Sequence, residues 1–327
     1  MRRREFCILG ATAGFALPGR TRADAPLATW TGRVLGAVGS IALHHEDPAR
    51  ARRLLSDCVA EIARLEAVFS LWQPGSALAE LNRSGVLAPP PPEMVRLLMQ
   101  ARRVSALTDG VFDVTVQPLW ALHREYFAAH GPAAPGPSAE ALAAALALVD
   151  ARRMAVSPDR IALGRRGMAV TLNGIAQGFV TDAVVGLLRQ GGVAHTLVDL
   201  GEARAVGAHP SGRPWRAALD DPGRPGLPWA ELDLADRALA TSGDAGFVFD
   251  AAGRFTHLLD PRTGTSPRRH RAVSVLAPDA TLADALSTAF ALMPEAAIAR
   301  SLAALPGVEA RLLRHDGSVA AIQGGGA

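Results

Sequence analysis

Apolar residues recur at helical spacing in several segments of this chain. Between Asp47 and Phe69 they form a single stripe, as on one face of an amphipathic helix: Leu54, Leu55, Val59, Ile62, Leu65 and Val68. The same periodicity predicts further helices over residues 93–108, 139–149, 174–189, 282–293 and 295–305. Pro89–Pro92 breaks the chain between the first two helices.

Shorter segments alternate or run apolar, as β-strands do. Arg33–Ala42 predicts a strand that bends at Gly36, and Val111–Val116 alternates before Pro118. Further strands are predicted at residues 154–156, 161–163, 169–172, 196–200, 203–206, 215–219, 229–232, 238–241, 247–249, 256–259, 272–277 and 308–313. Strands and helices alternate in groups rather than in a strict βαβ rhythm, which favours an α+β fold. We expect one large domain, residues 26–327, of mixed sheets with flanking helices.

Residues 1–25 have the pattern of an export signal. Arg3-Arg4-Glu5-Phe6 precedes an apolar run, Cys7–Leu17, and small residues follow around Ala23. The paired arginines resemble a twin-arginine signal. The run of about 11 residues is shorter than the ~20 that span a bilayer. We therefore expect a cleaved signal, a periplasmic protein and no membrane span in the mature form.

Composition narrows the function classes. The pI is about 9.6, but the net charge is only +3 and all 34 basic residues are arginine. These arginines are scattered, and only 5% of residues are aromatic, so nucleic-acid binding is disfavoured. Without the signal, Cys58 is the one cysteine left, which excludes an internal disulfide and a Cys/His metal cluster.

Polar clusters stand out between residues 241 and 288. They read Thr241–Gly246, Thr256–Gly264 and Ala283–Thr288, and they supply hydroxyls, a histidine and a carboxylate. In a helix, Asp284 and Thr288 would share one face and could hold a hard cation. Alternatively, the aspartate offsets the helix dipole and the threonine bonds its own backbone.

Two more features permit phosphate chemistry. His257 could act as a base, although a lone histidine in an apolar strand is often a core residue. Thr241-Ser242-Gly243 could bring backbone N–H groups to a phosphate, or form an ordinary turn. The segment Thr171–Asp182 opens a helix with glycines, which favours an anion or nucleotide site there; Asn173 could instead be a simple cap.

The order of these motifs resembles the ApbE family of FAD:protein FMN transferases. The matching segments, which start from about Leu35, are residues 69–72, 77–82, 108–119, 173–182, 241–244, 257–264 and 283–288. The resemblance implies a T-fold-like architecture and Mg²⁺-dependent cleavage of FAD. FMN would pass to a Thr or Ser hydroxyl of an exported acceptor protein, with release of AMP.

The resemblance also implies roles for individual residues. His257 would be the catalytic base, and Gly174, Asp284 and Thr288 would hold Mg²⁺. Asp109 and Gly110 would lie against the adenosine, and Trp72 would stack on a ring. The full set of expected FAD-binding positions is Leu35, Trp72, Thr108, Asp109, Gly110, Thr171, Gln177, Thr241, Ser242, Gly243 and Leu258.

Four places depart from the family pattern. Gly201-Glu202-Ala203 stands where Gly-Gly-Asp is usual, and Leu35-Gly36-Ala37 where Met-Gly-Thr is usual. The chain has Thr171 where an acidic residue is usual, and Gln177 where Lys or Glu is usual. These changes leave an alternative open: an exported FAD-binding protein, or a weak FAD pyrophosphatase, that has lost transfer to a protein. An interaction protein that uses the fold without flavin is a third hypothesis.

Overall fold

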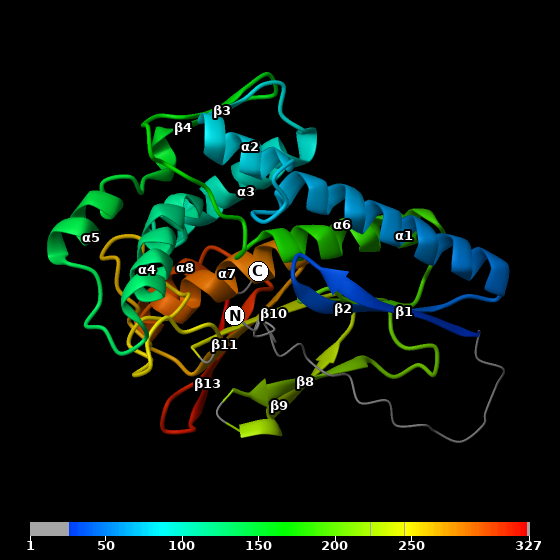
Figure 1. Ribbon diagram of the computed structural model, residues 1–327. Coiled ribbons are helices and arrows are strands. Elements are labelled where there is room, and N and C mark those ends of the chain that lie inside the picture. Colours follow the sequence, from blue (N-terminus) through cyan, green and yellow to red (C-terminus); the bar gives the residue numbers. More distant parts are fainter. Residues whose placement is uncertain (1–25, 223, 245, 326–327) are drawn as a thin grey trace.

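A computed structural model describes residues 26–222, 224–244 and 246–325, without the side chain of residue 225. Its centre is an antiparallel 8-stranded sheet in the order β1-β2-β6-β7-β10-β11-β12-β13. The strands are β1 (Leu27–Val34), β2 (Ala37–His44), β6 (Thr196–Asp199), β7 (Ala203–Val206), β10 (Ala238–Gly243), β11 (Ala272–Ala277), β12 (Glu309–Leu313) and β13 (Val319–Gln323). Figure 1 shows this sheet beneath a layer of helices. The α+β prediction is confirmed.

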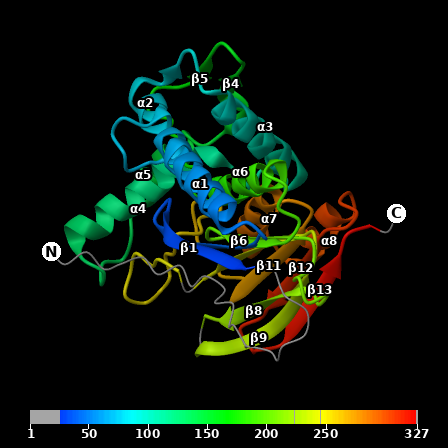
Figure 2. The ribbon, with the colours of Figure 1, turned by 90° about the vertical axis from the view of Figure 1, so that its right-hand side faces the viewer.

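The helices α1 (Pro48–Phe69), α6 (Ala176–Gln190) and α7 (Ala280–Leu292) cover one face of this sheet (Figures 1 and 2). Asp47 caps α1 by accepting from the N–H groups of Ala49 and Arg50. The helix α7 is buried on nearly every side because it packs against α6, β10 and β11. Its position places Asp284 and Thr288 inside the molecule rather than on its surface.

A two-stranded sheet, β8 (Trp215–Asp221) with β9 (Arg224–Leu234), lies on the opposite face. A separate apolar cluster joins it to the main sheet, and Trp215, Leu234 and Leu276 belong to that cluster. The strand β11 is therefore covered on both faces, which explains why all its residues, Ala272–Ala277, are buried.

Most of the remaining elements lie above the helix layer or, like α4 (Gln117–His130) and α5 (Ala139–Leu146), beside it (Figure 2). They are α2 (Ala77–Ser84), α3 (Pro92–Leu107), α4, α5 and a 3-stranded sheet of β3 (Val86–Leu87), β5 (Ile161–Leu163) and β4 (Met154–Val156), with 3-10 turns at Val114–Val116 and Ala151–Arg153. The helix α8 (Glu295–Leu302) lies beside β13. Within the described residues, none of the helices has both the length and the hydropathy needed to cross a bilayer.

The prediction of a single bent strand over Arg33–Ala42 is wrong. This segment contains the turn of the hairpin β1–β2 and parts of both its strands. The chain reverses there because Leu35 and Gly36 both take positive φ values, 48° and 94°. The predicted strands at residues 111–116, 169–172, 247–249 and 256–259 are not formed as such. Residues 114–116 make a 3-10 turn, and Val248 and Thr256 make one isolated bridge.

The helix α4 and the strand β13 were not among the predicted elements. The predicted signal, residues 1–25, lies outside the described residues. Cys58 is free and buried, and burial raises the pKa of its thiol to about 12. Such a thiol is a packing residue rather than a nucleophile.

Candidate functional site

The first turn of α6 meets the middle of α7 through Asp284. The backbone N–H of Gly178 donates to Oδ2 of Asp284 at 3.0 Å. This N–H belongs to the first turn of the helix, where backbone donors have no partner within the helix. Asp182, one turn later, accepts from the N–H groups of Ala280 and Thr281, both at 2.9 Å, and also pairs with Arg204. The carboxylate of Asp182 therefore caps α7 and fixes Asp284 against α6.

Glu202 lies within electrostatic reach of Asp284, and Asp199 lies within reach of Glu202. Burial raises the pKa of Asp284 to about 7 and that of Asp199 to about 6. Burial, and then the charges of Asp284 and Asp199, raise the pKa of Glu202 well above its usual range. The Oε2 atom of Glu202 is buried without a hydrogen-bond partner in the described structure. These three carboxyl groups therefore hold their protons to a higher pH than exposed carboxyl groups do.

Thr288 brings a hydroxyl to the same part of α7. A Cβ atom added to Gly174 would lie 2.8 Å from Oγ1 of Thr288, so the backbone of Gly174 lies directly against this hydroxyl. Ser242 Oγ is 3.5 Å from Thr288 Oγ1 and 2.9 Å from Ser287 Oγ. The structure therefore brings three predicted residues, Gly174, Ser242 and Thr288, to one point.

The end of β10 supplies Thr241, Ser242 and Gly243. Thr241 is exposed, and its Oγ1 lies 2.8 Å from the hydroxyl of Ser274 on β11. Its backbone N–H also bonds the carboxylate of Glu202. The end of this strand consequently touches both the acidic cluster and the hydroxyl group at Thr288.

His257 is held by the carbonyl of Phe247. That oxygen lies 2.8 Å from the backbone N of His257 and 3.2 Å from its Nδ1. A Cβ atom on Gly246 would approach His257 Cε1 to 2.4 Å, so only glycine leaves room for this ring position. Burial lowers the pKa of His257, although the Phe247 carbonyl and Asp244 act in the opposite direction. The imidazole is therefore neutral near pH 7.

Trp72 lies in a group of rings rather than alone. It is 61% exposed, makes a T-shaped contact with Trp120 at 6.1 Å, and has the Arg124 guanidinium 5.9 Å from its ring centre. Leu258 is half-buried and packs against the main hydrophobic core. Trp72 thus offers an open aromatic surface.

Residues 108–110 form the turn that ends α3. Thr108 is fully buried; its hydroxyl donates to the carbonyl of Val104 and accepts from the N–H of Phe112. Asp109 and Gly110 take positive φ values of 51° and 74°, as in a left-handed helix end. The carboxylate of Asp109 is exposed and acts electrostatically on Arg262. Thr108 shapes the turn, and Asp109 and Gly110 are its accessible part.

Leu35, Thr171 and Gln177 complete the predicted set. The N–H of Leu35 donates to Oε1 of Glu66 at 2.5 Å, at the tip of the β1–β2 hairpin. Thr171 Oγ1 accepts from the N–H of Asn173 at 3.3 Å, and so begins the turn before α6. Gln177 is buried with no partner for Nε2 in the described structure, and its amide lies against Gly201.

Sequence reasoning missed several residues of this region. Asp199 ends β6 and Glu202 follows it in a turn, and the sequence assigned neither carboxyl group a role; the structure brings Glu202 within electrostatic reach of Asp284 on α7. Trp120, Arg124 and Phe247 were also missed, because α4 was not predicted and the order of aromatic residues carries no spacing signal.

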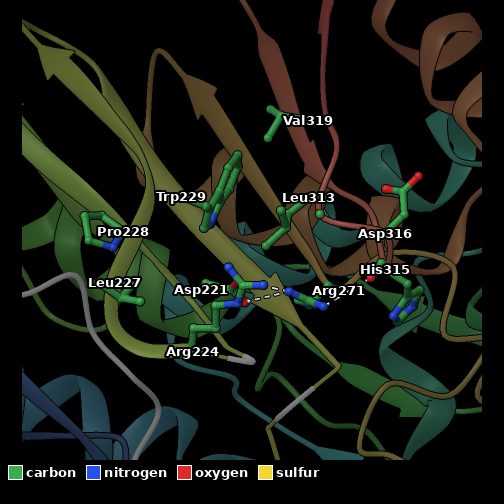
Figure 3. A pocket seen from close by; sticks show the side chains of 11 residues that line it. Asp221, Arg224, Leu227, Pro228, Trp229, Arg271, Leu313, His315, Asp316 and Val319 are labelled. Atoms are coloured by element: carbon green, nitrogen blue, oxygen red, sulfur yellow. Dashed lines mark hydrogen bonds and ion pairs between the residues drawn. The ribbon is translucent and has the colours of Figure 1, made fainter.

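The structure also has a pocket of about 370 Å³ beside the start of β11, and both Arg271 and Asp221 line it (Figure 3). It is lined by β9 and the β12–β13 turn, including Trp229, Leu313 and Val319. Arg271 is paired there with Asp221 at 2.9 Å. None of the predicted site residues lines this pocket, so it is separate from the group described above.

Comparison with known proteins identifies the family. The model of the ApbE family matches residues 35–312. The chain is 30% identical to the FAD:protein FMN transferase of Klebsiella pneumoniae strain 342, over 81% of this chain and 79% of that protein. It is similar to the flavin transferase ApbE from Vibrio cholerae, with a TM-score of 0.77 at 27% identity, over 91% of this chain and 98% of that one.

The ApbE protein from Thermotoga maritima has the same architecture, with a TM-score of 0.81 at 25% identity, over 91% of this chain and 97% of that one. Since the family match spans most of the described residues, and the fold agrees over nearly the whole of both solved structures, the chain belongs to the ApbE family.

Proposed function

We propose that this chain transfers FMN from FAD to a threonine or serine hydroxyl of an acceptor protein and releases AMP. Its curated relatives bear the name FAD:protein FMN transferase. The observation that carries the proposal is the meeting of Gly174, Ser242, Asp284 and Thr288 at the junction of α6, β10 and α7. This junction offers carboxylate, hydroxyl and carbonyl oxygens for a cation–pyrophosphate pair.

The residues at this junction fit Mg²⁺. In the residues that the structure describes, no three His, Cys, Asp or Glu side chains form a metal-binding group. A hard cation can instead use a carboxylate, a hydroxyl and a backbone carbonyl, and keep water or phosphate oxygens elsewhere. Asp284, Thr288 and the carbonyl of Gly174 would hold the ion, and the unpartnered Oε2 of Glu202 is a further oxygen nearby. When bound, Mg²⁺ would neutralise charge on the pyrophosphate.

The reaction needs a base for the acceptor hydroxyl. The Phe247 carbonyl fixes the proton of His257 on Nδ1, which leaves a lone pair on Nε2. The hydroxyl oxygen attacks the FMN-side phosphorus, the bond from that phosphorus to the bridging oxygen breaks, and AMP leaves with that oxygen. The hydroxyl proton passes to Nε2 of His257. A lowered pKa keeps the imidazole in the accepting form.

The place of reaction follows from the chain's first residues. We propose that residues 1–25 direct export by a twin-arginine route, and that the acceptor is an exported protein met in the periplasm. Detection of the mature chain in a periplasmic extract, and its loss when Arg3 and Arg4 are both changed to Lys, would test this part separately.

The activity is tested with residues 26–327, FAD, Mg²⁺ and a candidate exported acceptor, by FMN fluorescence of the acceptor in a denaturing gel. Asp284→Ala is expected to abolish labelling, and His257→Ala to slow it by about 10²–10⁴-fold. Asp159→Ala, an exposed change, serves as the control. Full labelling by Asp284→Ala would refute the proposal, and AMP release without labelling would favour the pyrophosphatase alternative.

A further inference from the structure

Seven aromatic side chains form one connected group around α4. Only 5% of the residues are aromatic. Nevertheless, rings from α4 and from residues 247–255 form a connected group with Trp72. Its members are Trp72, Trp120, Tyr126, Phe127, Phe247, Phe249 and Phe255. Most of these rings are buried or half-buried, whereas Trp72 faces solvent.

Arg124 is placed over the exposed end of this group. Its guanidinium carbon lies 5.9 Å from the centre of the Trp72 ring and 5.2 Å from that of Trp120, whose centres are 6.1 Å apart. Both distances are within the range of a cation–π contact. The two tryptophans and the guanidinium thus form a triangle that fixes the orientation of Trp72.

The N–H groups of Arg124 make no hydrogen bond to another described residue. Within the described residues, its one ion partner is the neighbouring Glu125, at 3.8 Å, and both side chains are exposed. A guanidinium carries five N–H donors in one plane. Because the rings hold this plane without using its donors, the edge of Arg124 can donate to a flat ligand lying on Trp72.

The triangle is connected to the proposed base. Trp120 contacts Phe247 at 6.4 Å, and the carbonyl of Phe247 positions His257 through two contacts. A ligand ring on Trp72 would therefore lie on the same side of the molecule as the group that accepts the proton. The flavin half of FAD carries the phosphate that is transferred, so its ring is the one expected near His257.

We propose that Arg124 and Trp120 determine specificity for the isoalloxazine ring of FAD, with Trp72 as the stacking surface. This inference rests on the proposed function. Of the two rings of FAD, only isoalloxazine carries carbonyl oxygens, which a guanidinium edge recognises by donated hydrogen bonds. Adenine lacks them, so Arg124 distinguishes the two halves of the substrate. Trp120 is a positioning residue, since it holds both Arg124 and Trp72.

The test measures binding of FAD, FMN and ADP separately to residues 26–327, by flavin fluorescence and by calorimetry. Arg124→Gln is expected to raise the Kd for FMN about tenfold and to leave that for ADP unchanged. Trp120→Leu should weaken FMN binding in the same way and reduce the quenching of flavin fluorescence. Trp120→Phe should retain part of the FMN affinity and part of the quenching. Arg103→Gln, on the exposed face of α3, is the matched control.

Equal weakening of FMN and ADP by Arg124→Gln, or no weakening of either, would overturn the inference. An unchanged melting temperature for Arg124→Gln shows that a loss of FMN affinity does not come from unfolding. If the unmodified chain binds neither FAD nor FMN, the proposed function itself fails, and this result is distinct from FAD binding that is indifferent to Arg124.

Discussion

The backbone N–H of Gly178 donates to Oδ2 of Asp284 at 3.0 Å, which joins the first turn of α6 to the centre of α7. A carboxylate at this position accepts from a helix start and is favoured by the helix dipole. This bond uses Oδ2 of the carboxylate. The packing of α6 against α7 and the position of Asp284 in the candidate metal site therefore depend on the same hydrogen bond.

Gly178→Ala is expected to destabilise the protein. A Cβ at this position would lie 2.2 Å from the carbonyl oxygen of Ala280 and 2.8 Å from Cα of Thr281, both of them backbone atoms. The two helices must separate to admit it, which typically costs about 1–3 kcal/mol. Chemical denaturation followed by circular dichroism measures this change in the free energy of unfolding.

Gly186→Ala is the matched control on the same helix. No atom lies within 4 Å of its added Cβ, so the better helix propensity of alanine should stabilise α6 by up to about 1 kcal/mol. If the two substitutions change the unfolding free energy equally, the close approach of α6 and α7 does not govern stability.

Stability of the Mg²⁺-free protein is expected to fall as pH rises from about 4 to 7. Asp199 and Asp284 have pKa values raised by burial, to about 6 and about 7, and Glu202 is raised by burial and by these neighbours. The folded state therefore holds protons that the unfolded state has already released in this range. A raised pKa costs roughly 1.4 kcal/mol per unit once the pH exceeds it. Melting temperatures in EDTA at pH 5 and pH 8 measure the effect.

Glu202→Gln and added Mg²⁺ separate the causes of this pH dependence. The substitution removes one titrating group without changing its shape, so the loss of stability toward pH 8 should shrink. Mg²⁺ should stabilise the protein more at pH 8 than at pH 5, because the cation binds deprotonated carboxylates. A melting temperature that rises steadily from pH 5 to pH 8 in EDTA would contradict the raised pKa values.

Much of the fold could be predicted from local patterns. The 3.6-residue period located α1 and α7, and alternation located β10 and β11. The pattern at Arg33–Ala42 predicted one bent strand instead of a hairpin, because small apolar residues fit both structures. The turn was not foreseen because leucine rarely takes the positive φ that Leu35 has. The helix α4 was missed because its buried face mixes His123 with Leu119 and Phe127.

The candidate site was predictable only in part. Motif order placed Asp284, Thr288 and Gly174 in one group, and the structure brings them close. The carboxyl groups of Asp199 and Glu202 could not be assigned, because β6 and β7 reach α7 only through long-range pairing in the sheet. Thr108 shows the reverse case: its motif is prominent, but its hydroxyl is used within the α3 turn.

Gly174→Ala is expected to weaken Mg²⁺ binding by about tenfold or more. The added methyl group would lie 2.8 Å from Oγ1 and 3.0 Å from Cγ2 of Thr288, so the hydroxyl must rotate or the Gly174 carbonyl must move. Either change displaces an expected ligand by a few tenths of an ångström. Mg²⁺ titration monitored by melting temperature gives the affinity. Gly75→Ala, with no atom within 4 Å of its Cβ, should leave the titration unchanged.

Gly246→Ala is expected to lower the rate of FMN transfer without changing FAD affinity. A methyl group there would lie 2.4 Å from Cε1 and 3.0 Å from Nδ1 of His257, so the imidazole must turn away from the Phe247 carbonyl. A base displaced by about 1 Å can lose about 10²-fold in rate, while the flavin contacts proposed at Trp72 would be unaffected. Single-turnover labelling of an acceptor, with Kd for FAD measured in parallel, separates the two quantities. The pH–rate profile adds a second readout, because an imidazole freed from its carbonyl partner and exposed to water should titrate nearer its usual pKa. Equal losses in rate and in FAD affinity would show that Gly246 shapes the binding site as a whole rather than the position of His257.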